Sequence, residues 1–138
     1  MVINVLVATF LVAHAAIHLA FIAPSPPVTA DGPAWPFTTN DSWLLQRLGL
    51  DAAAIRVLAG ALVAATLVAL AIAALAALGV VPAELWIPAL TAGAVASLGL
   101  LIAFFHPWLG LGIAIDVGLL WAGLLAGWVP ASSGLPGS

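Results

Sequence analysis

The chain contains no cysteine and no lysine, and it has very few charged side chains of any kind. The absence of cysteine excludes disulfides, cysteine-ligated zinc, iron–sulfur clusters and thiol chemistry. Two arginines supply all of its Lys and Arg charge, which is too little to neutralise the phosphates of a nucleic acid. Only 5% of its residues are charged, against about a quarter in a soluble domain. Charge therefore cannot cover a soluble surface of ordinary size, and a nucleic-acid partner is excluded.

Hydrophobic residues make up 65% of the chain, and they gather in four long runs. The runs cover residues 2–22, 52–81, 85–106 and 109–129. Each is long enough to cross a hydrocarbon core of about 30 Å at about 1.5 Å per residue. They are continuously apolar and do not alternate as barrel strands would, so helices are the expected structure. We predict an all-α integral membrane protein.

The breaks between the runs carry residues that end helices. Pro24, Pro82, Pro107 and Pro130 follow the four runs in turn. Most connections are short, which predicts four transmembrane helices in one up-down bundle and a single domain over residues 1–138. The first run should be a retained helix, because no Lys or Arg precedes it as in a signal peptide. The expected location is the cytoplasmic membrane of a bacterium, with the chain as a multi-pass protein in the bilayer.

The long connection, residues 23–50, contains Asp41-Ser42 ahead of a short amphipathic stretch. Either side chain can cap a helix over about 42–49. This helix would lie at the membrane interface, with its apolar residues toward lipid and Gln46 toward water. It serves either as an anchor or as a cover for one mouth of the bundle.

Orientation depends on the two arginines, Arg47 and Arg56, which flank the first connection. The other connections and the C-terminal tail have neither Lys nor Arg. The positive-inside rule therefore places residues 23–50 in the cytoplasm and both termini outside.

Five ionisable residues fall within the runs, namely His14, His18, Arg56, His106 and Asp116. An up-down bundle brings the end of the first run, the start of the second, the end of the third and the start of the fourth to one membrane side. All five residues lie near those ends. At about 1.5 Å per residue, His14 and Asp116 come out at similar depth, roughly 10–12 Å below that surface. We predict a polar cluster of His14, His18, Arg56 and Asp116, with His106 at its rim.

Small residues share helical faces with three of these side chains, a pattern typical of close helix packing in membranes. The three faces are Gly112, Asp116, Gly123 and Gly127; Arg56, Gly60 and Ala64; and Gly99, Ala103 and His106. The pattern predicts that each face turns toward another helix of the bundle or toward another protomer, away from lipid.

The cluster admits a structural reading and a ligand-binding reading. In the structural reading Asp116 pairs with Arg56, each histidine bonds a carbonyl or hydroxyl, and the cluster fixes helix register. In the other reading His14, His18, His106 and Asp116 bind zinc, iron, copper or manganese, and Arg56 completes a cofactor site. The ligand-binding reading also includes a haem between the first and third helices, held by one histidine from each. The sequence does not identify the cofactor.

No nucleophile motif, phosphate-binding loop or carboxylate pair is present, so the sequence gives no sign of an enzyme. A proton relay through the cluster is a minor alternative. We expect a structural or accessory subunit, with other membrane subunits or copies of itself as partners. The alternative from a different class is a metal- or haem-binding redox subunit.

Overall fold

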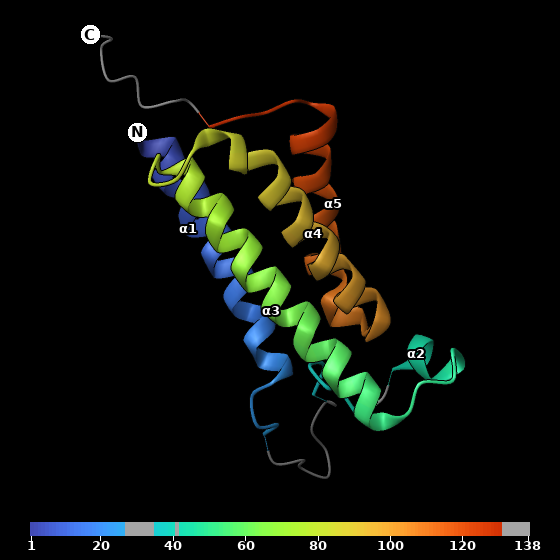
Figure 1. Ribbon diagram of the computed structural model, residues 1–138. Helices are drawn as coiled ribbons and strands as arrows, with labels where there is room; N and C mark the ends of the chain where they lie inside the picture. The colour runs from blue at the N-terminus through green and yellow to red at the C-terminus, as the bar shows by residue number, and fades with distance from the viewer. Residues whose placement is uncertain (27–34, 41, 131–138) are drawn as a thin grey trace, which may run out of the picture.

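The computed structural model describes residues 1–26, 35–40 and 42–130, and within these ranges the chain is helical and contains no strand. Four helices are long and apolar enough to cross a membrane: Val2–Phe21, Ala52–Ala77, Ala83–Ala103 and Pro107–Leu125. The prediction of an all-helical chain with four such helices is confirmed. The first helix begins and the last one ends at the same end of the bundle, so consecutive long helices alternate in direction (Figure 1).

The helix α3, Ala52–Ala77, packs against both α1, Val2–Ile17, and α4, Trp86–Ala103 (Figure 1). The last long helix, α5, covers Gly110–Leu120 and packs mainly against α4. Three-residue 3₁₀ turns, Ala83–Leu85 and Pro107–Leu109, precede α4 and α5. A 3₁₀ turn, His18–Phe21, continues α1, and a π-helical turn, Trp121–Leu125, continues α5.

The apolar core is divided into two clusters along the bundle. One includes Leu11 of α1, Leu70 of α3 and Leu90 of α4. The other lies toward the opposite end and includes Phe21, Ile55, Val63, Leu100 and Leu109. On every helix that joins both clusters, a polar residue falls between the two sets: His18 after α1, Thr66 on α3 and Ser97 on α4. The bundle thus encloses one polar layer between two apolar ones.

Three of the predicted helices end earlier than their apolar runs. The helix α3 stops at Ala77 because Gly79 takes a left-handed conformation, φ 73°, where the run continues to residue 81. The helix α4 stops at Ala103, three residues before the predicted end. The π-helical turn after α5 ends at Leu125, and Gly127 follows with φ 61°. In each case the apolar run extends beyond the last helical residue, so hydropathy alone overestimates the length of the helix.

The end of α4 is completed by the first connection. Pro107 has no N–H, so it cannot donate to the carbonyl of Ala103 four residues earlier. The hydroxyl of Ser42 donates to that carbonyl instead, at 2.6 Å. The indole Nε1 of Trp43 donates to the preceding carbonyl, that of Ile102, at 2.8 Å. Two carbonyls that the helix leaves open are thereby paired.

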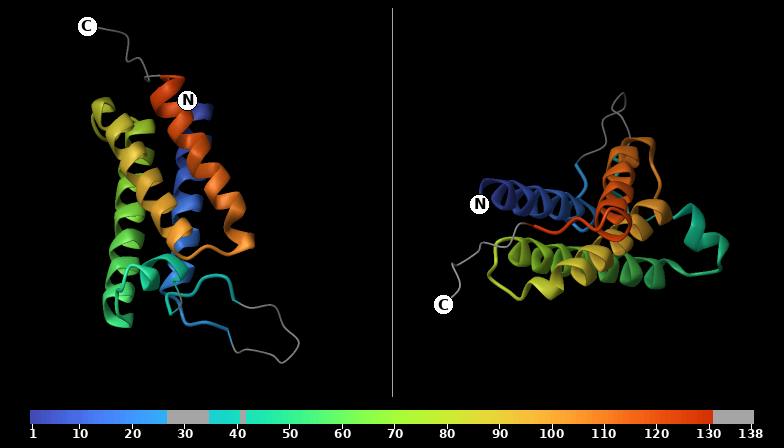
Figure 2. Two further views of the ribbon diagram at one scale, coloured as in Figure 1. Left: turned by 90° about the vertical axis from the view of Figure 1, so that its right-hand side faces the viewer. Right: turned by 90° about the horizontal axis from the view of Figure 1, so that it is seen from above.

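The short helix α2 covers Trp43–Arg47, inside the predicted range 42–49 (Figure 2). Ser42 is its N-cap, since its Oγ accepts from the backbone N–H of Leu45 at 3.1 Å. The alternative cap, Asp41, lies outside the described residues. Leu45 is buried in the second core cluster, so α2 is held to the bundle by packing as well as by hydrogen bonds.

Candidate functional site

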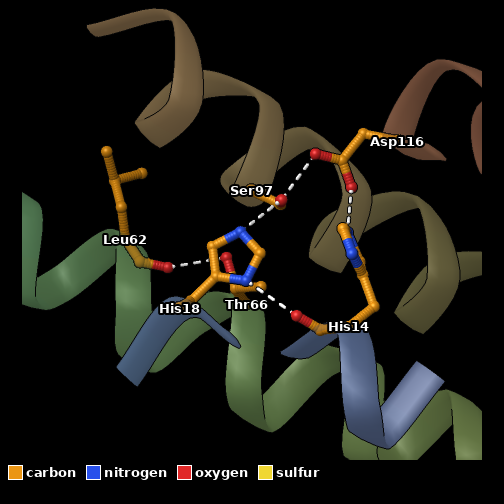
Figure 3. Close-up of polar contacts among 6 residues, drawn as sticks. All are labelled: His14, His18, Leu62, Thr66, Ser97 and Asp116. Carbon is orange, nitrogen blue, oxygen red and sulfur yellow. Dashed lines mark hydrogen bonds and ion pairs between the residues drawn. The ribbon is translucent and has the colours of Figure 1, made fainter. Parts of the chain in front are cut away.

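Four side chains from three parts of the bundle form one hydrogen-bonded network (Figure 3). His14 Nε2 lies 2.8 Å from Asp116 Oδ1. The Ser97 hydroxyl lies 2.5 Å from Asp116 Oδ2 and 2.7 Å from His18 Nε2. His18 Nδ1 lies 3.0 Å from the backbone carbonyl oxygen of His14. The contacts therefore close a ring that starts and ends on His14, and we call these four residues the polar network.

Local helix geometry explains the two histidine positions. His14 and His18 are four residues apart and therefore lie on one face. At His18 the chain tightens from an α-helix into a 3₁₀ turn, and its backbone N–H bonds to Ala15 and Ala16. The carbonyl of His14 is then open to the imidazole of His18. The end of α1 thus fixes the orientation of that ring.

Close helix packing brings Ser97 and Asp116 together. One turn before Asp116, a Cβ added at Gly112 would lie 2.8 Å from Leu101 Cδ1. One turn before Ser97, a Cβ added at Gly93 would lie 2.6 Å from Leu70 Cδ2. Glycine at these positions lets α4 approach α5 on one side and α3 on the other. The predicted packing of the Asp116 face is therefore seen at Gly112.

The network is almost completely removed from solvent. Asp116 and Ser97 are 0% exposed, His18 is 2% and His14 is 4% exposed. Phe10 stacks with the His14 ring at 6.2 Å between centroids, and Phe21 lies 6.5 Å from the His18 ring. Such an apolar surrounding strengthens each hydrogen bond and raises the cost of an unpaired one.

A cavity of about 130 Å³ borders the two imidazoles. Ile17 and Phe21 line it from the first long helix, Leu101 from α4, and Leu109 and Gly112 from the last long helix. Phe37 of the first connection also lines it. The cavity lies between the first and last long helices, on the side of the network that faces the long connection.

Two residues of the predicted cluster lie outside the network. Arg56 is exposed and borders a separate surface depression with Phe37 and Asn40. In the part of the chain that the structure describes, Arg56 forms no ion pair; the ion pair there joins His14 to Asp116. Arg56 therefore does not pair with Asp116 as the structural reading expected, and it is not part of the hydrogen-bonded network. Ile55 and Ala59 lie on the buried face of α3. Arg56 is one position further along the helix and therefore points about 100° away from that face.

His106 is half-buried and has a different partner. Its Nδ1 accepts from the backbone N–H of Trp108 at 3.3 Å, and it caps the 3₁₀ turn that precedes α5. Of the two partners predicted for the faces of Arg56 and His106, a helix of the same bundle is not present at Gly60 or Gly99. A Cβ at Gly60 or at Gly99 would meet no atom within 4 Å. Both glycines therefore lie on open surface of the described chain, with no helix of this chain packed over them.

Ser97 is the member of the network that the sequence analysis missed. A single hydroxyl in an apolar helix is a weak signal, because it can bond to its own helix backbone. Thr66 does this, since its hydroxyl donates to the Leu62 carbonyl at 2.9 Å (Figure 3). Ser97 lies one turn after Gly93, and this small-xxx-small spacing could have marked it as an interface residue.

The predicted ligand set does not gather around one point. No group of three or more His, Cys, Asp or Glu side chains among the described residues could hold a metal ion. Both ring nitrogens of His18 and the Nε2 of His14 are already in hydrogen bonds. A haem iron needs an open imidazole nitrogen, and His18 has none. In this hydrogen-bonded arrangement His18 therefore cannot ligate an iron or another metal.

No family model matches the chain, and no curated protein or solved structure matches it either.

Proposed function

We propose that this chain spans a lipid bilayer four times, in the cytoplasmic membrane of a bacterium. The length and apolar character of the four helices support this placement. Large apolar side chains are exposed on every long helix, among them Phe10, Val68, Val95 and Leu111. A surface of this kind is costly in water and is covered by acyl chains in a bilayer.

Within the membrane the chain acts as a structural or accessory subunit of a larger assembly. The observation that carries this proposal is the closure of the polar network. Both carboxylate oxygens of Asp116 are paired with groups of the same chain, and His18 uses both ring nitrogens internally. The network joins the first long helix, α4 and α5, and thereby fixes their arrangement.

The outer surface supports a role in assembly. The open glycines Gly60 on α3 and Gly99 on α4 allow another helix to approach the backbone closely. Other membrane subunits or further copies of this chain are the partners that such surfaces suit.

The test is purification of the full-length chain from its native membrane in a mild detergent. Light scattering should give a protein mass well above the 13.9 kDa of one chain. Visible absorption and metal analysis should show neither haem nor a stoichiometric metal. A particle that contains one chain would overturn the accessory role. A haem spectrum or one metal per chain would instead support a redox subunit that uses His14 or His18 with His106 and Asp116.

A further inference from the structure

The hydrogen bonds of the polar network require a definite number of hydrogens. The carbonyl oxygen of His14 can only accept, so His18 Nδ1 must carry a hydrogen. Ser97 has one hydroxyl hydrogen but takes part in two hydrogen bonds, to His18 Nε2 and to Asp116 Oδ2. The second hydrogen of this pair must come from His18 or from Asp116. A neutral His18 together with an ionised Asp116 leaves one of the two contacts without a hydrogen.

From this count we infer that the polar network is a binding site for one exchangeable proton, shared by Asp116 and His18 through Ser97. This inference goes beyond the accessory role and does not depend on any partner subunit. It gives the chain a ligand, the proton, and a path along which that proton moves.

Two arrangements of hydrogens satisfy all the contacts. In one, His18 is an imidazolium and Asp116 is a carboxylate that accepts from the Ser97 hydroxyl. In the other, His18 is neutral, Ser97 donates to His18 Nε2, and Asp116 carries a hydrogen on Oδ2 that it donates to Ser97. The first becomes the second when His18 Nε2–H passes its proton to Ser97 Oγ while Ser97 passes its own to Asp116 Oδ2. Total hydrogens and total charge are the same in both forms.

Charge favours retention of this proton. With the proton bound, the network has no net charge in either form, provided that His14 is neutral. Without it, the network holds one net negative charge that is completely buried. A buried unpaired charge is costly in a low-dielectric interior. Loss of the proton also brings two lone pairs together, either at 2.7 Å between Ser97 and His18 or at 2.5 Å between Ser97 and Asp116.

The neighbouring helices supply no other charge that could compensate for loss of the proton. His14 faces Asp116 and satisfies its contact as the neutral Nε2–H tautomer, so it needs no additional proton. The helix α3 faces the network with Thr66, whose hydroxyl is turned to its own backbone. Among the described residues, His14 is the basic side chain within ion-pair distance of Asp116, at 2.8 Å, and neither arginine is. Release of the proton therefore requires movement of Ser97 or of His18.

The cavity next to the imidazoles gives the proton an entry route. Its volume, about 130 Å³, exceeds the roughly 30 Å³ that one water occupies in the liquid. His14 and His18 both line it, and so does Phe37 of the first connection. A water in the cavity would therefore lie beside the imidazoles of the network. The proton thus enters from the end of the bundle that carries α2.

The first experiment measures the protonation state without any substitution. The full-length chain, with ¹⁵N-histidine and ¹³C-carboxyl aspartate, is placed in phosphatidylcholine vesicles for solid-state NMR at neutral pH. We expect His18 imidazolium with a carboxylate on Asp116, His18 Nδ1–H with a protonated Asp116, or a fast average of the two. A His18 that carries one hydrogen beside an ionised Asp116 would overturn the inference. Spectra of His14→Gln, His106→Gln and Asp116→Asn provide the assignments.

The second experiment tests Ser97 as the link. When the pH is raised, the His18 and Asp116 signals of the wild-type chain should change together in one step, because they share one proton. Ser97→Thr keeps the hydroxyl and should preserve this joint step, whereas Ser97→Ala should separate the two changes. His106→Gln alters a histidine outside the network and should leave the joint step unchanged. Separate steps in the wild-type chain, or a joint step in Ser97→Ala, would overturn the role of Ser97.

Discussion

The contact between α3 and α4 gives the sharpest test of the packing, because α4 carries two glycines in opposite surroundings. A Cβ at Gly93 would lie 2.6 Å and 2.7 Å from the Cδ2 and Cγ of Leu70, and 3.1 Å from its backbone nitrogen. Leu70 is 0% exposed, so its side chain has no space into which to move. A Cβ at Gly99 would meet nothing within 4 Å. Gly93→Ala and Gly99→Ala are therefore the same change on one helix, with and without a steric conflict.

The magnitude follows from two terms. Replacing glycine by alanine inside a helix gains about 1 kcal/mol at either site. Overpacking of a filled core costs about 1–3 kcal/mol, and only Gly93→Ala has this cost. The helix term cancels in the comparison, so Gly93→Ala should be less stable than Gly99→Ala by about 1–3 kcal/mol. This difference corresponds to roughly a 5- to 150-fold difference in the unfolding constant.

Dodecyl sulfate titration of the two variants in a mild detergent, followed by circular dichroism, measures the difference in free energy of unfolding. The wild-type chain should unfold between them, or close to Gly93→Ala if the two terms offset each other. Equal stability of the two variants would show that α3 and α4 do not approach each other at Gly93. The register of Ser97, one turn further along, would then also be in doubt.

Three further predictions concern the network, the first connection and the topology. Asp116→Leu leaves His14 Nε2 and the Ser97 hydroxyl without their acceptor, and should cost roughly 2–6 kcal/mol in the same titration. Val117→Leu, at an exposed neighbouring position, is the control. An equal loss of stability in both variants would contradict the buried hydrogen bonds of Asp116. Ser42→Ala removes the cap of α2 and the donor to Ala103, and should cost about 2–4 kcal/mol. The cost should be smaller in Pro107→Ala, where a backbone N–H becomes available for the Ala103 carbonyl; strictly additive effects would refute this account. In membrane vesicles, Val2→Cys and Val129→Cys should react with an impermeant thiol reagent from one side and Gln46→Cys from the other, and labels at 2 and 129 on opposite sides would exclude four spans.

The number and order of the long helices could be predicted from the sequence because each apolar run is about as long as a membrane is thick. The helix ends could not. Gly79 and Gly127 end their helices through left-handed backbone conformations, and neither interrupts the hydropathy pattern. The pairing of Ser42 with Ala103 joins residues that are 61 positions apart. No local pattern gives the partner of such a contact.

The site could be predicted in part. The spacing of His14 and His18 and the matching depth of Asp116 are enough to place these three residues together. Arg56 satisfies the same depth argument, but depth does not specify direction around the helix axis. Ile55 and Ala59 take the inward direction on α3, so Arg56 points outward. Ser97 could be found only from the packing of the helices. Its two hydrogen-bond partners, His18 and Asp116, come from two other helices.

The contact between His14 and Asp116 joins residues that are 102 positions apart, near the beginning and the end of the chain. In the proposed membrane placement, a chain that inserts in the order of its synthesis would hold His14, His18 and Ser97 in the bilayer before Asp116 has been made. During that interval the growing protein has polar groups in lipid whose acceptor is absent, and such groups are costly there. Arrival of the last helix removes this cost. In that placement, the polar network is complete only after the helix that carries Asp116 has joined the other three.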